Sequence, residues 1–186
     1  MKINAIQRRE MAIEAPDVEA RTVRLSASSE FPVQRYDWDK NRFYDEILSH
    51  NPADVDLSRM QSGAPVLDGH HGDTIGINQD AEVSGGRMST TARFGKSARA
   101  SEVWQDVVDG IRRAVSVGYE LIKCVKREVG EDGRERLTFS WRPYEVSFVG
   151  VPADPTVGVG RAMEIEERAL EVPAPENKPK TIFIVE

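Results

Sequence analysis

Four stretches of the chain alternate apolar and polar residues, and this pattern constrains the fold more than any other feature of the sequence. The stretches are residues 21–27, 86–94, 114–121 and 145–149. Alternation with a period of two places every second side chain on the same face of a β-strand. The sequence therefore predicts several strands that each have one apolar and one polar face.

Two further segments are predicted to complete a β-rich fold. Residues 64–73 begin with a short apolar run and end in a cluster of polar and glycine residues, which indicates a strand that leads into a loop. Residues 131–134 (E-D-G-R) are typical of a turn, which would fold a strand at residues 137–141 back on the preceding strand. We expect a hairpin there.

Two helices are predicted beside the strands. Apolar residues recur at helical spacing in residues 39–50, and Pro52 would stop that helix. His50 would then lie at the helix C-terminus and interact with the helix dipole. The second helix would begin after Ser97 as its N-cap and end at Gly110 as its C-cap.

Length and composition describe a globular chain with polar extensions. The 186 residues, of which 39% are hydrophobic and 30% charged, suit one domain with tails. No apolar run approaches the roughly 18 residues that cross a bilayer. The single cysteine, Cys124, excludes an intrachain disulfide, and the formal net charge of −6 gives no general attraction to nucleic acid. We expect a flexible arm at residues 1–20, a folded domain at 21–161, and a charged helix with a proline-rich tail at 162–186.

The sequence supplies the three kinds of side chain that acyl transfer needs. His70 or His71 offers an imidazole, Ser116 a hydroxyl and Glu145 a carboxylate. A serine becomes nucleophilic when a base within hydrogen-bond reach takes its proton, and a carboxylate holds that imidazole in the required tautomer. A water-facing serine, a surface glutamate and a loop histidine are also common, so a purely structural role remains the alternative interpretation.

The loop around His70 supports a second hypothesis, a metal site. Asp68, His70, His71 and Asp73 form a D-x-H-H-x-D cluster whose imidazoles and carboxylates could bind a divalent transition metal. A closed site usually needs three or four ligands. With His50 as the remaining imidazole, the other ligands would have to be carboxylates.

Several motifs follow one another in a familiar order. They are residues 65–70 (P-V-L-D-G-H), Gly76, residues 86–88, residues 115–119 (V-S-V-G-Y) and residues 144–153 (Y-E-V-S-F-V-G-V-P-A). This order resembles the prohead maturation protease family of tailed phages, and the resemblance covers about residues 21–161. That family is related in fold to assemblin, the capsid-maturation protease of herpesviruses.

The resemblance implies a fold and an activity. The fold would be α+β, a compact β-barrel of assemblin type with surrounding helices. The protein would be a serine endopeptidase that cleaves scaffold and capsid-protein segments, and itself, during head maturation. In this family's arrangement Ser116 falls at the nucleophile, His70 at the general base and Glu145 at the third catalytic position.

The resemblance also implies partners and a location. The partners would be the major capsid protein and scaffold segments, with a homo-oligomer as a further expectation. No cofactor, metal, membrane or specific nucleic acid is expected, and the protein would act inside the immature head in the host cytoplasm. Two rival hypotheses are a non-catalytic assembly module that binds capsid or scaffold subunits through its arm and tail, and a metal-dependent hydrolase.

Overall fold

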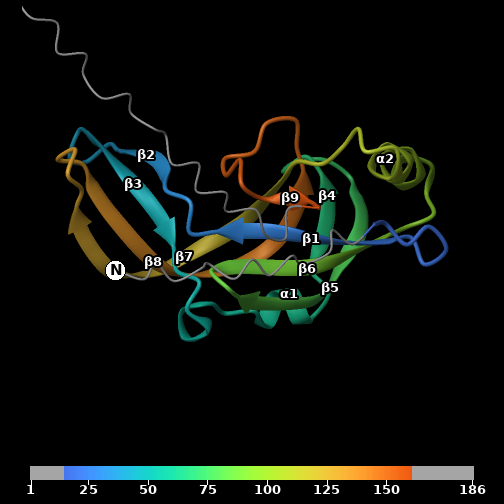
Figure 1. Cartoon of the computed structure of the whole chain (residues 1–186), viewed down its shortest axis with the longest axis horizontal. Coiled ribbons are helices and arrows are strands. Elements are labelled where there is room, and N and C mark those ends of the chain that lie inside the picture. The colour runs from blue at the N-terminus through green and yellow to red at the C-terminus, as the bar shows by residue number, and fades with distance from the viewer. Residues whose placement is uncertain (1–14, 161–186) are drawn as a thin grey trace, which may run out of the picture.

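The computed structural model describes residues 15–160, and most of them belong to one sheet of nine strands (Figure 1). The strands are β1 (Thr22–Ser29), β2 (Val33–Asp37), β3 (Arg42–Leu48), β4 (Pro65–Asp68), β5 (Thr74–Ser84), β6 (Arg87–Phe94), β7 (Val115–Val129), β8 (Glu135–Phe148) and β9 (Gly158–Val159). The helices of this part of the chain are a 3₁₀ helix, η1 (Pro52–Asp54), and two α-helices, α1 (Ser58–Gln61) and α2 (Ala98–Val108). The sheet order is β2-β3-β8-β4-β5-β6-β1-β9, and β7 pairs with β8 outside this path.

Strand β8 lies at the centre of the sheet. Along one edge, β8 pairs antiparallel with β7 over nearly its whole length, as the turn at residues 131–134 predicted. Along its other edge, the first half of β8 pairs parallel with β3 and the second half pairs parallel with β4. The two strands predicted at 137–141 and 145–149 are therefore one continuous strand.

The apolar faces of the strands meet in the core. On β6 the predicted inward row is confirmed, with Met88, Thr90, Ala92 and Phe94 all buried. The Phe94 ring packs between Trp104 of α2 and Phe148 of β8, at ring-centroid distances of 5.0 and 5.5 Å. Helix α2 thus covers the core at one end of the sheet, and burial of these aromatic side chains is a large source of its stability.

Helix α2 begins and ends close to the predicted residues. The Ser97 hydroxyl accepts a hydrogen bond from the Ala100 backbone N–H at 3.3 Å, which satisfies one of the free donors of the first turn. The helix ends at Val108, with Asp109 as its C-cap and Gly110 following. The prediction of an amphipathic helix here is confirmed.

The predicted helix at residues 39–50 is wrong, because this segment belongs to a β-hairpin. Strand β2 pairs antiparallel with β3, and the turn between them includes Asn41 at a φ of 50°. Asparagine tolerates this left-handed conformation better than most residues. His50 is consequently not a helix cap. It follows β3 in the chain and is 5% exposed.

The last described strand lies between β1 and the start of β7. Strand β9 pairs with Leu25 and Ser26 of β1, and the Val159 N–H donates a hydrogen bond to the Arg113 carbonyl at 2.9 Å, two residues before β7 begins. The sheet therefore curls until its β9 edge meets the start of β7. In residues 15–160 neither α-helix has the length and apolar character needed to cross a lipid bilayer.

The predicted tails fall largely beyond this part of the chain. Of the predicted arm at 1–20, residues 15–20 are described, and the Asp17 and Thr22 backbones form an isolated bridge beside β1. The charged helix and proline-rich tail predicted at 162–186 lie outside the described residues.

Candidate functional site

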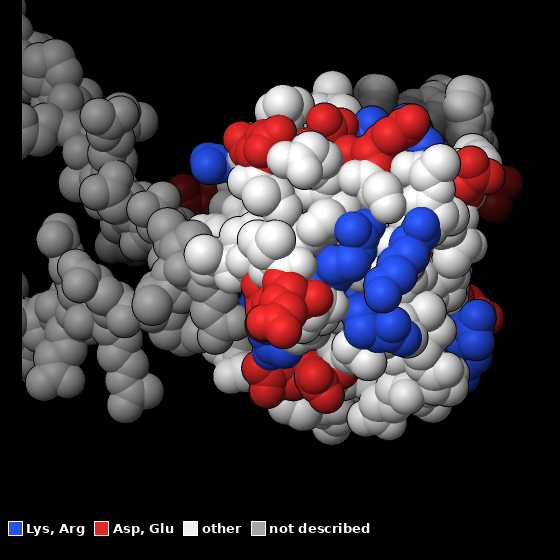
Figure 2. Space-filling model, turned by 90° about the vertical axis from the view of Figure 1, so that its right-hand side faces the viewer, with Lys and Arg blue, Asp and Glu red and all other residues white. Residues whose placement is uncertain are grey.

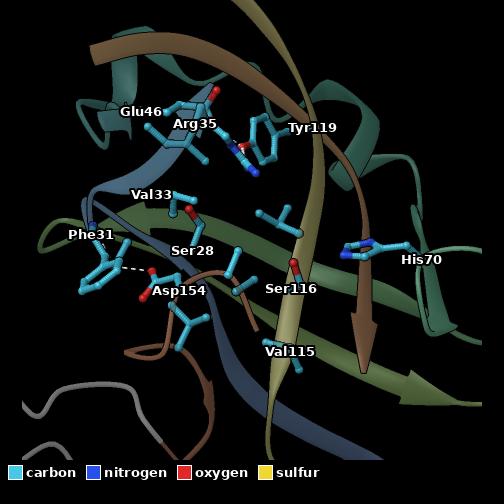
Figure 3. Close-up of a pocket in the computed structure, with 16 residues that line it drawn as sticks. Ser28, Phe31, Val33, Arg35, Glu46, His70, Val115, Ser116, Tyr119 and Asp154 are labelled. Carbon is cyan, nitrogen blue, oxygen red and sulfur yellow. Dashed lines mark hydrogen bonds and ion pairs between the residues drawn. The ribbon is translucent and has the colours of Figure 1, made fainter. Parts of the chain in front are cut away.

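A cavity of about 180 Å³ opens between β1, β2 and the first half of β7 (Figure 3). Ser28 and Ser29 border it from β1, Val33 and Arg35 from β2, and Ser116 from β7. Glu46 and Leu48 of β3, the loop before β9 and the His70 loop complete the wall. Two of the predicted site residues, His70 and Ser116, therefore face the same cavity.

His70 is fixed by a buried carboxylate. The chain turns after β4, and the Gly69 N–H donates to the Phe148 carbonyl at 2.9 Å, which ties this turn to the end of β8. His70 Nδ1 then lies 2.8 Å from Glu145 Oε1, and the Ser147 hydroxyl donates to Glu145 Oε2 at 2.6 Å. The Glu145 side chain is 4% exposed, whereas that of His70 is 41% exposed. The carboxylate orients the ring so that its opposite edge is directed toward the cavity (Figure 3).

Gly118 makes room for this carboxylate. It stands opposite Glu145 in the register of β7 and β8. A Cβ atom at Gly118 would come within 2.2 Å of Glu145 Oε1 and within 2.7 Å of the Tyr144 ring. The glycine of the S-V-G-Y motif therefore has a steric role at the site.

Burial of the polar row on β8 corrects one expectation. The alternation predicted that Glu145 and Ser147 would face away from the packed interior, but they are 3% and 0% exposed. His70 hydrogen-bonds to Glu145 on this face, and Ser147 hydrogen-bonds to the same carboxylate, so the buried polar groups are satisfied.

Ser116 lines the same cavity but is not part of the hydrogen-bonded set formed by His70, Glu145 and Ser147. It stands opposite Ser147 in the register of β7 and β8, and the His70 ring is turned toward it (Figure 3). Within residues 15–160, no hydrogen bond joins the Ser116 hydroxyl to His70 or to another residue. The structure thus forms the imidazole–carboxylate pair of the predicted triad, while the link that would activate a serine is not made.

Asp68 forms ion pairs with two arginines. Figure 2 shows the end of the molecule that carries α2, where positive side chains gather in a patch flanked by acidic ones. Arg99 Nε and Arg112 Nη1 donate to the two Asp68 oxygens at 2.7 and 2.5 Å. Burial tends to raise the pKa of Asp68, but the hydrogen bonds from Arg112 and Arg99 outweigh it and lower the pKa.

The metal hypothesis is not supported by this arrangement. In the described part of the chain, no three His, Cys, Asp or Glu side chains lie close enough together to hold a metal ion. Asp68 faces the arginines, and His70 is paired with Glu145. His71, the competing base, is exposed and does not line the cavity.

A second polar network lies at the other end of the cavity. The Tyr119 hydroxyl donates to Glu46 and accepts from Arg35 Nη2 at 2.8 Å, and Arg35 Nε donates to Glu46 at 3.1 Å. Burial, reinforced by the Glu46 carboxylate, raises the pKa of Tyr119 to about 12. Sequence patterns did not predict this network, because Arg35 and Glu46 come together only through the pairing of β2 with β3.

His50 is a buried histidine with one unsatisfied nitrogen. Its Nδ1 lies 2.9 Å from the Leu48 carbonyl, and its backbone N–H donates to Glu30 Oε1 at 3.0 Å. Its Nε2 is buried and has no hydrogen-bond partner in the described structure. Burial lowers the pKa of His50 below its ordinary value of 6.5, although the Leu48 carbonyl, Glu30 and Asp154 act in the opposite direction.

This histidine should make stability fall in mild acid. The unfolded chain binds a proton at His50 near pH 6.5, whereas the folded chain does so at a lower pH. The stabilisation is therefore complete above about pH 6.5 and is lost as the pH falls toward the folded-state pKa. We expect the urea midpoint of the wild type to drop more steeply between about pH 7 and 5 than that of His50→Asn, which keeps a donor for Leu48. The exposed His71→Asn is the control, and equal slopes in all three proteins would contradict this assignment.

Comparisons with known proteins show that the chain is similar in sequence to a component of the phage head. No protein-family model matches it, and no solved structure matches it. The chain is similar to a phage capsid protein. It is 46% identical over 147 residues to the major capsid protein of Halomonas phage phiHAP-1, an alignment that covers 75% of this chain and 23% of that protein. The chain thus spans about a quarter of the length of the curated relative that it matches.

This comparison corrects the predicted activity. The similar protein is named for a structural role, which contradicts the expectation of a serine endopeptidase. The expected relation to bacteriophage heads is supported, but membership of the prohead protease family is not. Because no solved structure matches, the α+β class and the assemblin-type barrel stay predictions.

Proposed function

We propose that this chain is a non-catalytic assembly module of a bacteriophage head that binds capsid and scaffold subunits while the immature head forms. The similarity to a major capsid protein over 75% of the chain carries this proposal. The module would accordingly be found in the phage head with the capsid subunits as its partners.

A structural role accounts for the polar groups beside the cavity. A buried carboxylate is costly unless hydrogen bonds satisfy it. Glu145 has such partners in His70 and Ser147, which join the loop after β4 to the end of β8. The pair fixes a loop at the surface of the module, and this role needs no contribution from the Ser116 hydroxyl.

Co-assembly with the capsid protein tests the proposal. The full chain, or its Ser116→Ala variant, is expressed with the major capsid protein of the same phage, and the particles are examined by electron microscopy and intact-mass spectrometry. We expect both chains to enter heads in equal yield, with a capsid protein of the same mass in both. A capsid protein that is shortened with the wild type and full-length with Ser116→Ala would overturn the proposal, as would failure of either chain to enter heads.

A further inference from the structure

A second hollow lies where the β2–β3 and β7–β8 hairpins meet at one end of the molecule (Figure 1). Its volume is about 600 Å³, and we call it the hairpin groove. Aromatic and aliphatic side chains line it from both hairpins, and charged side chains stand among them. The lining includes Trp38, Tyr44, Leu137, Phe139, Asp39 and Arg127.

Trp38 is the most exposed large hydrophobic residue next to this groove. Its side chain is 84% exposed, yet its ring is held edge-on against Tyr36 at a centroid distance of 4.7 Å. An exposed tryptophan leaves a large apolar surface in water, and tryptophan is the residue type most enriched among binding hot spots. The groove therefore offers a positioned aromatic anchor beside other apolar side chains.

The charged groups of the groove define what would bind beside that anchor. The Asp39 side chain forms no ion pair or hydrogen bond within residues 15–160, so its carboxylate is available to a cation. Arg127 Nη1 lies 3.1 Å from Glu135 Oε1, which leaves its other N–H groups for an anion. An occupant that carries a basic and an acidic residue close together would satisfy both.

One segment of this chain has the matching chemistry. Residues 172–180 read V-P-A-P-E-N-K-P-K, with three prolines, one glutamate and two lysines. Proline-rich segments favour the extended polyproline II conformation and bind aromatic-lined grooves at a low entropic cost. The negative charge of Glu176 is complementary to that of Arg127, and the positive charge of Lys178 or Lys180 is complementary to that of Asp39.

We propose that the hairpin groove binds the proline-rich segment 172–180 of a second copy of this chain. The choice of a second copy rests on the proposed function, because a head is assembled from many subunits. In Figure 1, β9, where the described chain ends, lies near the middle of the molecule, whereas the β2–β3 and β7–β8 hairpins, which line the groove, lie at one end. A chain that carries both a groove and the segment that fits it links copies by a heterologous contact.

Sedimentation velocity on the purified full chain tests this contact. We expect concentration-dependent self-association in the wild type. Trp38→Ala, and a variant in which Pro173, Pro175 and Pro179 are alanine, should each weaken it about 30-fold, the loss typical of a hot-spot residue. Val129→Ala is the matched control, because Val129 is 72% exposed on the β7–β8 hairpin but does not line the groove. Its self-association should stay within about twofold of the wild type.

A mixing experiment identifies the source of the segment. Trp38→Ala keeps an intact segment, and the proline variant keeps an intact groove, so the two should form a mixed dimer that neither forms alone. Absence of the mixed dimer, or an equal loss in Val129→Ala, would overturn the proposal. A wild type that is monomeric at every concentration yet still enters phage heads would overturn the groove contact and leave the proposed function standing. Circular dichroism melts of each variant check that the fold is retained.

Discussion

Replacing Trp141 by alanine is expected to lower the free energy of unfolding by about 4 kcal/mol. Trp141 lies on the central strand β8 and is 0% exposed. Its ring packs near His50 and Tyr119, at centroid distances of 5.6 and 5.9 Å, and its Nε1–H donates to the Ser49 carbonyl at 2.7 Å. The substitution leaves both a large cavity and a buried carbonyl without this donor, and both effects destabilise the folded state.

Urea denaturation of the two proteins at neutral pH measures this loss. Trp38→Ala is a matched control, because it removes the same side chain at a position that is 84% exposed. A surface substitution of this kind should change stability by less than about 0.5 kcal/mol. Similar midpoints for Trp141→Ala and the wild type would show that the centre of β8 is not packed as described.

Gly76→Ala should destabilise the protein by about 3 kcal/mol. Gly76 lies on β5, between Val66 of β4 and Phe94 of β6. A Cβ atom there would come within 2.3 Å of the Arg93 carbonyl oxygen and 3.0 Å of its carbon. Both atoms belong to the backbone of a paired strand, so the clash cannot be relieved by turning a side chain and requires the strands to separate.

Gly150→Ala is the matched control for this effect. A Cβ atom at Gly150 would meet nothing within 4 Å, and its φ does not fall in the left-handed region. We expect its thermal midpoint to stay close to that of the wild type and that of Gly76→Ala to fall by more than about 10 °C. A Gly76→Ala protein that melts with the wild type would contradict the close approach of β5 and β6.

Much of the sheet could be predicted because the alternation is clear where one face is buried. Strand β6 and helix α2 illustrate this, since their apolar residues recur with the periods of their elements. The segment at 39–50 misled because its apolar residues also fit a helical period. Its strand identity is set by pairing with β8, some 90 residues later, which no local window contains.

The site was harder to predict than the strands because it depends on register. The order of the sequence motifs predicted His70 and Glu145 as site residues. It did not predict that the Ser147 hydroxyl donates a hydrogen bond to the second carboxylate oxygen of Glu145. Its position two residues after Glu145, and therefore on the same strand face, was the available signal. The role of Gly118 follows from its place opposite Glu145, which is known once β7 and β8 are aligned.

The central position of β8 also affects how the protein folds during its synthesis. Strands β3 and β4 are synthesised early, but their shared partner follows about 90 and 80 residues later. Ribosomes add about 5–20 residues per second, so these early strands wait for several seconds with open edges. Contacts between such distant segments are slow to form, and unpaired edges can join those of other chains. Synthesis would therefore expose this chain to aggregation until β8 emerges, and a chaperone that shields strand edges should raise its yield.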